Sequence, residues 1–492
     1  MSEHAEGSDA TTVIDWPRRW HEVADVVVIG AGFAGLAAAA AAASAGSAVV
    51  VLEKMARPGG NSAINLGDYA AWDDGRHRRV ALGRGEDSAD GHAADALAAG
   101  QHYGDPELVA TMARGAPAAL DWMIAEGGLR LHDALHRQHR GPFRLHLADS
   151  GRDYVEALRT IGAKHGVTLR TGARLARLWR RDAHGPVVGV SIETTAGRRD
   201  IGARQAVVLA TGGFSADVAM RRSFRPVLSE AYNTTNHPGA TGEAIRLAQA
   251  VGADALHLAF IEAHPFAHPE TGALDAATLC ALRLRRQGGI IVSCAGQRVV
   301  NEEAVHDMVS RAIVATGARP AYTVYTEAML TQASALGNEA VAGMAEAIAR
   351  GRIRHAASVA ALGAELGMPD AALATTAARF AGFLAAGTDA DFARPLTATM
   401  LPLADGPCYA VPHWPAVHFT SGGLRINPRA QVIDIWGAPI PRLYAAGEVT
   451  GGIHGMSRVG GDTTAAPIVF GRIAGTRAAA ETRLAPESGG GR

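Results

Sequence analysis

The feature that most constrains the fold is a glycine pattern between two apolar runs near the N-terminus. Residues 24–54 read "ADVVVIGAGFAGLAAAAAAASAGSAVVVLEK". The β-branched runs 25–29 and 48–52 predict strands, and the alanine-rich segment between them predicts a helix. Gly30, Gly32 and Gly35 form G-x-G-x-x-G where the first strand turns into the helix. This order of strand, glycine turn, helix and strand predicts a dinucleotide-binding unit.

Each position of this unit has a physical role. Gly30 permits a tight turn, Gly32 lets a pyrophosphate reach the amides at the positive end of the helix, and Gly35 lets the helix lie close to the sheet. Glu53 ends the second strand, where a carboxylate can accept hydrogen bonds from the hydroxyls of an unphosphorylated ribose, as in FAD or NAD. We therefore predict that this end of the dinucleotide is bound by Gly30, Gly32, Phe33, Ala34, Gly35, Glu53 and Lys54.

Three later segments distinguish FAD from NAD. They are "RPGGNSAIN" after Glu53, "RQAVVLATGGFS", and "PRLYAAGEVTGGIHGMSRVGGDTTAAPIVFGRIAG" near the C-terminus. A nicotinamide-binding domain does not need the chain to return to the same cofactor so late, whereas a flavin does. The predicted flavin contacts are Gly60, Asn61, Ser62, Thr211, Gly212, Gly447, Glu448, Gly461, Thr463 and Thr464.

Together these segments resemble the flavoprotein family of FAD-dependent fumarate reductases and succinate dehydrogenases, with 3-ketosteroid dehydrogenases and urocanate reductases as relatives. "AGEVTGGIHGMSRVGG" occupies the place of the family's A-G-E-x-x-G-G-x-H-G-x-x-R-x-G-G. The resemblance implies an α/β fold, a Rossmann-like FAD-binding domain of the GR2 type with an inserted α+β capping domain. We expect the FAD-binding domain at 20–262 and 395–485, the capping domain at 263–394, and flexible termini at 1–19 and 486–492.

The resemblance also implies a substrate site. His418, before "FTSGGLRINPRA", matches the histidine of the family's H-x-T-x-G-G, which anchors a substrate carboxylate. Arg458 matches the arginine that grips the same group, and its planar fork suits a pair of oxygens. His264 matches the family's H-P histidine. The structural alternatives are a buried histidine bonded to a backbone carbonyl for His418, a surface ion pair for Arg458, and a core histidine for His264.

The predicted proton donor departs from the family. In "VVNEEAVHDMVSRAI", His306 stands where the family's N-E-x-x-x-R-D has arginine. Upstream, Arg285 matches the relay arginine, but Leu282 replaces the relay glutamate and Ala281 replaces a small hydroxyl residue. His306 is the hypothesised general acid or base, because imidazole titrates near neutral pH. The alternatives are a surface histidine of the capping domain at this position, and Tyr69 as the donor.

Composition excludes several classes of partner. The 47 basic and 48 acidic residues give a net charge of -1, so we expect no nucleic-acid partner. No stretch approaches 18 apolar residues, and the few scattered cysteines suit a reducing compartment, so we predict a cytoplasmic protein without a membrane span. His132, His136, His139 and His146 are interpreted as a solvated loop, and no metal is expected. The segment after the G-G-N turn has no histidine for flavin attachment, so FAD should be non-covalent.

These observations predict an enzyme, an FAD-dependent oxidoreductase acting on CH–CH bonds. Hydride would move between flavin N5 and a C–C bond conjugated to a carbonyl or carboxylate, in an ene-reductase or a desaturating dehydrogenase. Leu282 and Ala281 argue against a C4 dicarboxylate, because a second buried carboxylate would lack a partner. No C-x-x-C-H haem motif occurs, so a separate electron donor or acceptor is expected. The alternatives are an oxidase or dehydrogenase of a ketone or steroid-like substrate that uses oxygen or quinone, and a non-catalytic flavoprotein.

Overall fold

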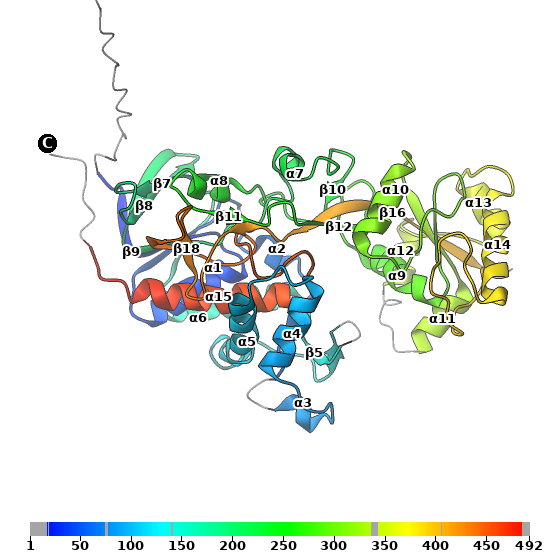
Figure 1. Cartoon of the computed structure of the whole chain (residues 1–492), viewed down its shortest axis with the longest axis horizontal. Helices are drawn as coiled ribbons and strands as arrows, with labels where there is room; N and C mark the ends of the chain where they lie inside the picture. The colour runs from blue at the N-terminus through cyan, green and yellow to red at the C-terminus, as the bar shows by residue number, and fades with distance from the viewer. Residues whose placement is uncertain are drawn as a thin grey trace, which may run out of the picture.

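The computed structural model describes residues 17, 19–73, 77–138, 141–335, 343–404 and 406–484. Within these ranges the chain forms two bodies side by side (Figure 1). The first contains the N-terminal and C-terminal segments, drawn in blue and red, and the second contains the green and yellow middle of the chain. The termini predicted to be flexible lie almost entirely outside the described residues.

The first body is built on a largely parallel sheet in the order β18-β19-β9-β1-β2-β6, with β8 and β7 continuing from β9. β1, β2, β6, β9 and β19 are parallel neighbours along this order. The strands are β1 (Glu22–Ile29), β2 (Val49–Leu52), β6 (Thr168–Arg170), β7 (Arg174–Arg180), β8 (Val187–Thr194), β9 (Gly197–Leu209), β18 (Gln431–Ile433) and β19 (Pro439–Ala445). They are rich in valine, isoleucine and leucine because a covered parallel sheet is buried on both faces.

The carboxyl ends of the central strands meet at one edge of this sheet. Ile29 pairs with Leu52 on one side and with Leu209 on the other, and Leu209 pairs with Ala445. The segments that follow these strands are the ones in which the sequence predicts cofactor contacts. Ligands of such sheets bind at this edge.

Helices cover the sheet and bring in the remaining segments. α1 (Phe33–Ser44) and α15 (Asp462–Ala479) pack against each other, and α15 also packs on β9 and β19. The other helices of this body are α2 (Gly60–Ala63), α3 (Arg78–Ala81), α4 (Ala89–Ala99), α5 (Pro106–Gly127), α6 (Gly151–Lys164), α7 (Val218–Phe224) and α8 (Glu243–Gln249). One small sheet consists of β3 (Asp68–Ala70), β5 (Phe143–Leu147) and β4 (Leu135–Arg137), and another of β11 (Ala255–Leu256) and β17 (Gly423–Leu424).

The second body contains a mainly antiparallel sheet centred on the long strand β16 (Cys408–Thr420). β16 pairs with β12 (Ile261–Ala267), β14 (Ala321–Thr326) and β15 (Arg354–Ala356) in antiparallel fashion and with β10 (Asn233–Thr234) in parallel. β13 (Ile290–Val292) extends the sheet beyond β14. The helices are α9 (Ala276–Leu284), α10 (His306–Ala315), α11 (Glu327–Ala335), α12 (Met344–Ala349), α13 (Val359–Glu365) and α14 (Ala372–Ala386). This mixed α+β body contains most of the predicted capping domain, and the name is used for it below.

Two hydrophobic cores correspond to the two bodies, and β12 and β16 contribute to both. Ile261 and Val417 belong to the first core, whereas Phe266 and Trp414 belong to the second. The second core also takes in residues 408–411, which lie beyond position 394, because β16 runs through both cores. The domain boundaries at 262/263 and 394/395 therefore stay predictions.

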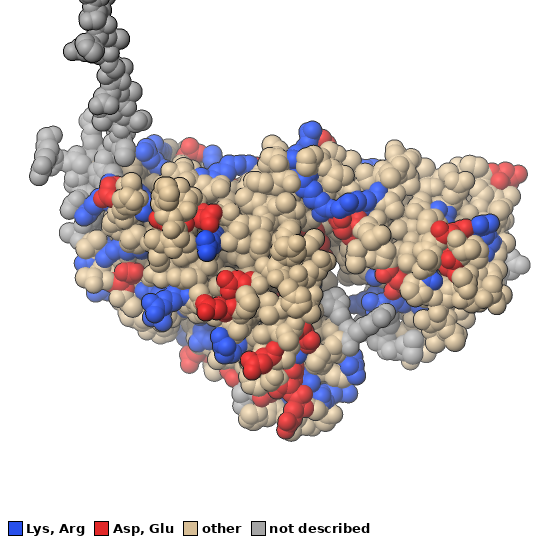
Figure 2. All heavy atoms as spheres, viewed as in Figure 1, with Lys and Arg blue, Asp and Glu red and all other residues tan. Residues whose placement is uncertain are grey.

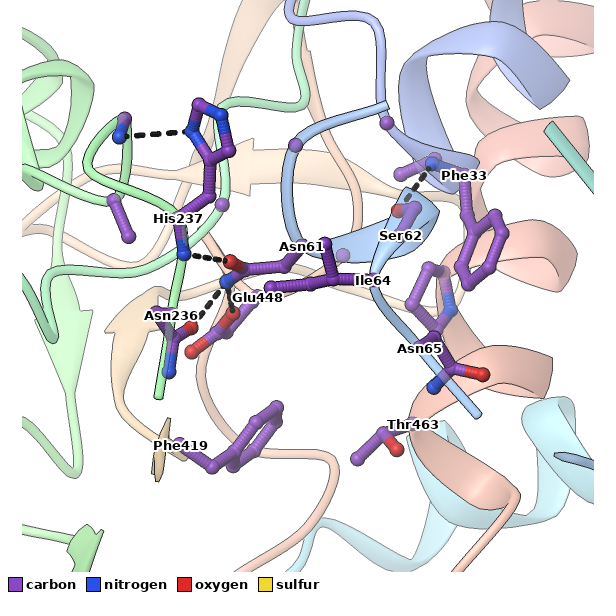
Figure 3. A pocket seen from close by; sticks show the side chains of 18 of the residues that line it. Phe33, Asn61, Ser62, Ile64, Asn65, Asn236, His237, Phe419, Glu448 and Thr463 are labelled. Carbon is purple, nitrogen blue, oxygen red and sulfur yellow. Dashed lines mark hydrogen bonds between the residues drawn. The ribbon is translucent and has the colours of Figure 1, made fainter. Parts of the chain in front are cut away.

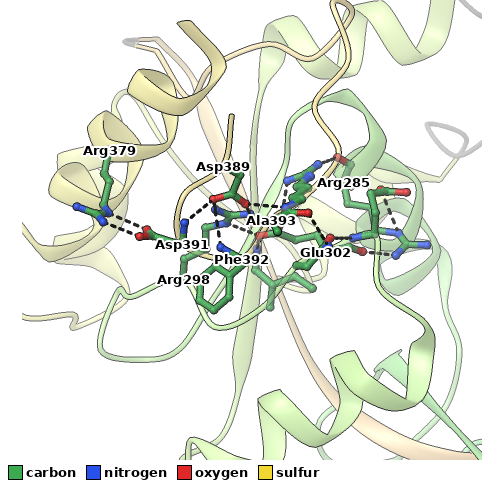
Figure 4. A network of polar contacts seen from close by, with 12 residues as sticks. Arg285, Arg298, Glu302, Arg379, Asp389, Asp391, Phe392 and Ala393 are labelled. Carbon is green, nitrogen blue, oxygen red and sulfur yellow. Dashed lines mark hydrogen bonds and ion pairs between the residues drawn. The ribbon is translucent and has the colours of Figure 1, made fainter. Parts of the chain in front are cut away.

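A buried network of charges in the capping domain joins the segment between β13 and α10 to the segment after α14 (Figure 4). The Glu302 carboxylate accepts hydrogen bonds from Arg298 at 2.7 and 2.8 Å and from Arg394 at 3.0 Å. Arg298 also bonds to Asp389 at 2.8 and 3.0 Å. A buried ion is stable only when it is paired and hydrogen-bonded, as it is here. Glu302, which belongs to the family's N-E-x-x-x-R-D pattern, is thus a structural residue of the cap.

Acidic and basic residues alternate over the face shown in Figure 2, as the balanced composition predicts. Among the residues that the structure describes, none of the helices is long and apolar enough to cross a membrane. The cysteines Cys280, Cys294 and Cys408 are all free thiols.

Candidate active site

The predicted dinucleotide turn has the geometry that its glycines suggest. Gly30 has φ of +100°, and a Cβ on it would lie 2.3 Å from the Ala210 carbonyl oxygen. A Cβ on Gly35 would lie 1.9 Å from the Gly30 oxygen. A larger residue at position 30 is therefore excluded by the left-handed backbone conformation and by the clash of its Cβ, and at position 35 by the clash alone.

Glu53 holds this turn in place. One carboxylate oxygen accepts a hydrogen bond from the Ala31 amide at 2.8 Å, and the other accepts from the Met55 amide at 2.8 Å. Ser62 Oγ accepts from the Phe33 amide at 2.9 Å. Glu53 thus connects β2 to the glycine turn, in addition to the predicted contact with ribose.

A cavity of about 1010 Å³ runs from the glycine turn to the capping domain. Most of the predicted cofactor residues line it, namely Gly30, Gly32, Phe33, Ala34, Glu53, Lys54, Gly60, Asn61, Ser62, Thr211, Gly212, Gly447, Glu448 and Thr463. Gly35, Gly461 and Thr464 lie outside the lining. Gly461 instead precedes α15 with φ of +83°, and its carbonyl accepts the Ala70 amide at 3.2 Å.

Asn61 is the centre of a polar network in the middle of the cavity (Figure 3). Its amide nitrogen donates to Asn236 Oδ1 and, at 3.4 Å, to Glu448 Oε2, while its oxygen accepts the His237 amide at 2.7 Å. Phe419 and Thr463 lie across the open space from it. Residues from three distant parts of the chain are therefore fixed relative to one another here.

The same network continues into β16. Glu448 Oε1 accepts hydrogen bonds from the Thr420 amide at 3.0 Å and from its hydroxyl at 3.1 Å. Burial raises the pKa of the Glu448 carboxyl, and the two Thr420 bonds oppose the shift. Asn236 Nδ2 donates to the His418 carbonyl at 2.6 Å. The loop that carries Glu448 is thereby tied to the strand that carries His418.

Three of the four predicted substrate residues form a cluster of imidazoles. The ring centroids of His264 and His306 are 4.9 Å apart, and those of His264 and His418 are 5.3 Å apart. Burial, followed by the charge of Arg458, lowers the pKa of His264 to about 3 and places that of His418 well below its usual range. His264 and His418 are therefore neutral at physiological pH and can donate or accept hydrogen bonds without carrying charge.

Arg458 completes the cluster and lines the same cavity. Its Nε lies 3.7 Å from Glu262 Oε2, and its guanidinium lies over the Phe419 ring with Cζ 5.4 Å from the centroid. The side chains of Arg458 and Glu262 are only 16% and 18% exposed. The structure therefore places Arg458 inside the cavity rather than in a surface ion pair.

His306 is the first residue of α10 and reaches the cavity from the capping side. Leu282 also lines the cavity, whereas Ala281 is buried behind it. Arg285 matches the family's relay arginine but is only 6% exposed and does not line the cavity. Its guanidinium donates to the Leu282 carbonyl at 2.9 Å and to the Glu302 carbonyl. Arg285 therefore does not contact the cavity beside His306.

Tyr69, the alternative proton donor, is not in the cavity. It is fully buried, its hydroxyl donates to the Ala116 carbonyl at 2.8 Å, and its ring stacks on Tyr154 with centroids 6.0 Å apart. Burial also raises the pKa of its phenol far above the ordinary value. Tyr69 is a core residue, and its assignment as a donor is corrected on this geometry.

Sequence reasoning missed several cavity residues. Thr235 Oγ1 lies 2.7 Å from His418 Nδ1, and His237 and Asn236 hold Asn61. Their only sequence signal is their place at "HPGATGEA", which His237 begins and which Thr235 and Asn236 precede. Glu262 was also missed, although its position two residues before His264 on a strand puts both side chains on one face.

Across the described ranges, no group of three or more histidine, cysteine, aspartate or glutamate side chains is placed to hold a metal ion. His132 bonds to Asp149 at 2.8 Å, and His139 lies outside the described residues.

The cavity residues fit FAD. At the N-terminus of α1 the Phe33 amide is bonded to Ser62 Oγ, and Gly32 supplies no side-chain cap to the amides that follow, so these can meet a pyrophosphate. The buried hydroxyl of Thr211 has no hydrogen-bond partner. Positions Gly60 and Gly212 have no neighbouring atom within 4 Å of an added Cβ, because they open onto the cavity.

Comparison with known proteins agrees with this geometry. The sequence profile described as "FAD binding domain" matches residues 25–464. The chain is 32% identical over 468 residues to the fumarate reductase (cytochrome) of Shewanella frigidimarina, covering 93% of this chain and 77% of that protein. It is 33% identical over 471 residues to the urocanate reductase of Eggerthella lenta, covering 93% and 74%.

The fold matches as well. The open conformation of a flavocytochrome c3 fumarate reductase superposes with a TM-score of 0.81 at 31% identity, covering 94% of this chain and 79% of that one. Its FAD-binding and capping domains correspond to the two bodies described above, which confirms the predicted fold class. The chain belongs to the FAD binding domain family, as a flavoprotein oxidoreductase of the fumarate reductase group with FAD as its cofactor.

Proposed function

We propose that the protein reduces a C=C bond conjugated to one carboxylate or carbonyl group of a small compound. The observation that carries the proposal is the continuous cavity, because it joins the dinucleotide turn to Arg458 and the imidazole cluster. FAD, held without a covalent bond, would supply the hydride when bound. The relatives named for fumarate and urocanate reduction support the direction of the reaction.

Arg458 and His418 are proposed to hold the activating oxygen atoms. A guanidinium presents a planar fork to a carboxylate, and a neutral imidazole donates one further hydrogen bond. Thr235 engages His418 at Nδ1, and the Phe266 backbone engages His264 at Nδ1, so both rings keep Nε2 for a ligand. Donors directed at an oxygen that gains negative charge during the reaction lower the barrier.

His306 is proposed to protonate the carbon next to the one that receives hydride. It approaches from the capping domain, whereas Glu53 and Asn61 approach from the FAD-binding domain. Proton and hydride would therefore reach the substrate from different walls of the cavity. The capping domain would also exclude water from the reacting atoms.

The substrate is proposed to carry one activating group and an apolar remainder. The cap contributes Leu274, Leu279 and Leu282 to the cavity beside Arg283, and a carboxylate placed against the three leucines would lose its hydrogen bonds to water. The same apolar wall favours a second candidate, a dehydrogenase that desaturates a ketone or a steroid-like compound. The free thiols support a cytoplasmic location, and a separate protein or small molecule is proposed to exchange electrons with the flavin.

Anaerobic stopped-flow spectroscopy tests the proposal. Photoreduced enzyme is mixed with enoates and enones of increasing size, and flavin absorbance is followed. We expect at least one compound to reoxidise the flavin within seconds and to leave the saturated product. A flavin that stays reduced with every compound would support a non-catalytic flavoprotein, and rapid reoxidation by air alone would support an oxidase.

A further inference from the structure

The inference concerns Glu262, a carboxylate beside the anchor arginine inside the substrate cavity. Glu262 lies on β12, where it pairs with Phe419 of β16 and shares a strand face with His264. Both Glu262 and Arg458 line the cavity, and 3.7 Å separates Glu262 Oε2 from Arg458 Nε. Neither of these atoms has a hydrogen-bond partner. The two side chains are therefore held together by charge, through atoms that are buried between them.

This pair changes the charge that a substrate meets. His264, His418 and His454 line the cavity and are neutral at physiological pH, because burial lowers the pKa of each. The positive charge of Arg458 is thus opposed directly by Glu262. Arg283 also lines the cavity from the capping side, so Glu262 reduces the positive charge at Arg458 in particular.

Among the described residues, the other carboxyl groups near Arg458 form no ion pair with it. Asp68 and Glu448 line the cavity, and burial raises the pKa of both, against the opposing effect of Arg458. Glu448 is committed to Thr420. Glu262 is the carboxylate that forms an ion pair with the anchor.

We propose that Glu262 is a specificity-determining residue that discriminates against anionic substrates, most strongly against dianions, in favour of alkenes activated by an uncharged carbonyl. The proposal rests on the proposed function of the same cavity. Two like charges a few ångströms apart repel appreciably in a partly buried site. An anionic substrate must approach Arg458 next to Glu262, whereas a ketone, ester or amide oxygen can accept hydrogen bonds there without that repulsion.

A charge series with one alkene core tests this proposal. Fumarate, monomethyl fumarate and dimethyl fumarate carry two, one and no negative charges, and Glu262→Gln removes the repelling charge at nearly constant volume. We expect kcat/KM for fumarate to rise roughly tenfold or more, the monoester to gain less, and the diester to change by less than about twofold. Dividing each variant value by the wild-type value removes the effect of the methyl groups.

Binding of the saturated analogues provides a readout that does not need turnover. Succinate and its monomethyl and dimethyl esters are titrated into the oxidised holoenzyme, and Kd is taken from the perturbation of the flavin spectrum. The same order of gains is expected. Glu230→Gln is the matched control, because Glu230 is 69% exposed in an ion pair with Arg222 and lies outside the cavity lining. It removes the same formal charge and should leave every ratio unchanged.

The outcomes separate the two proposals. If Kd for succinate falls selectively in Glu262→Gln while the whole panel of enoates, enones and fumarate esters leaves the flavin reduced, the proposed reaction fails and the role of Glu262 stands. If the esters and the acids change by the same factor, or if fumarate binds more weakly in the variant, the role of Glu262 is refuted. Flavin content and thermal denaturation confirm that each variant is folded.

Discussion

Replacing His306 with alanine is the sharpest test of the proposed chemistry. A positioned general acid contributes about 10²- to 10⁴-fold to a rate. His306 starts α10 and is half-buried, and the preceding Val305 is 67% exposed. Water can therefore enter when the imidazole is removed and can supply some of the protons. We expect a loss near the lower limit, about 100-fold in the rate of flavin reoxidation, or about 2.7 kcal/mol.

The assay is a single turnover of pre-reduced enzyme with saturating substrate under anaerobic conditions. These conditions exclude substrate binding and the external electron donor from the measured rate. His355→Ala is the matched control, because His355 is an exposed histidine of the same domain and does not line the cavity. If His306→Ala keeps more than about a tenth of the wild-type rate with its flavin content unchanged, His306 is not the proton donor.

Further predictions follow from buried groups and from the cofactor turn. Burial lowers the pKa of His264 to about 3 and that of His413 to about 4, against the usual 6.5. Between the folded and the unfolded pKa the unfolded chain binds more protons, so the free energy of unfolding should rise with pH, and at pH 5 each histidine should lower it by roughly 2 kcal/mol. His413→Gln should flatten this pH dependence in urea denaturation. Gly35→Ala should abolish FAD binding, because the added Cβ would overlap the Gly30 carbonyl oxygen of the glycine turn. The measurement is the flavin-to-protein absorbance ratio. Gly382→Ala is the control and should bind FAD normally, because Gly382 lies on α14 with open space around it. Acid precipitation of the protein should leave all the flavin in the supernatant. A yellow pellet would indicate covalent attachment, and His237, which lines the cavity beside Asn61, would then be the residue to test.

The dinucleotide end was predictable because its determinants are local in the sequence. The turn at Gly30 to Gly35 and the acid at Glu53 lie within one strand–helix–strand unit, so spacing alone assigns their places. The apolar run in "RQAVVLATGGFS" is the end of the longer β9 (Gly197–Leu209), whose first half pairs with β8. The alternation in that half was too irregular to be read as part of the same strand.

The substrate end was less accessible to sequence reasoning because its contacts cross long separations. Asn61 and Asn236 are 175 positions apart, and Glu262 meets Arg458 only after β12 pairs with β16. Tyr69 illustrates the opposite error. A tyrosine soon after a cofactor turn looks available in sequence, but β3 directs it into the core, where its hydroxyl is satisfied by Ala116.

The two strands that pass through both cores have a mechanical consequence. His264 lies on β12 between Ala263 of the first core and Phe266 of the second, and His418 lies on β16 directly after Val417 of the first core. If the two bodies rotate relative to each other, these two imidazoles lie near the hinge and would move little. His306 on α10 would move with the capping domain. The imidazoles proposed to contact the ligand and the histidine proposed to deliver the proton would therefore move by different amounts.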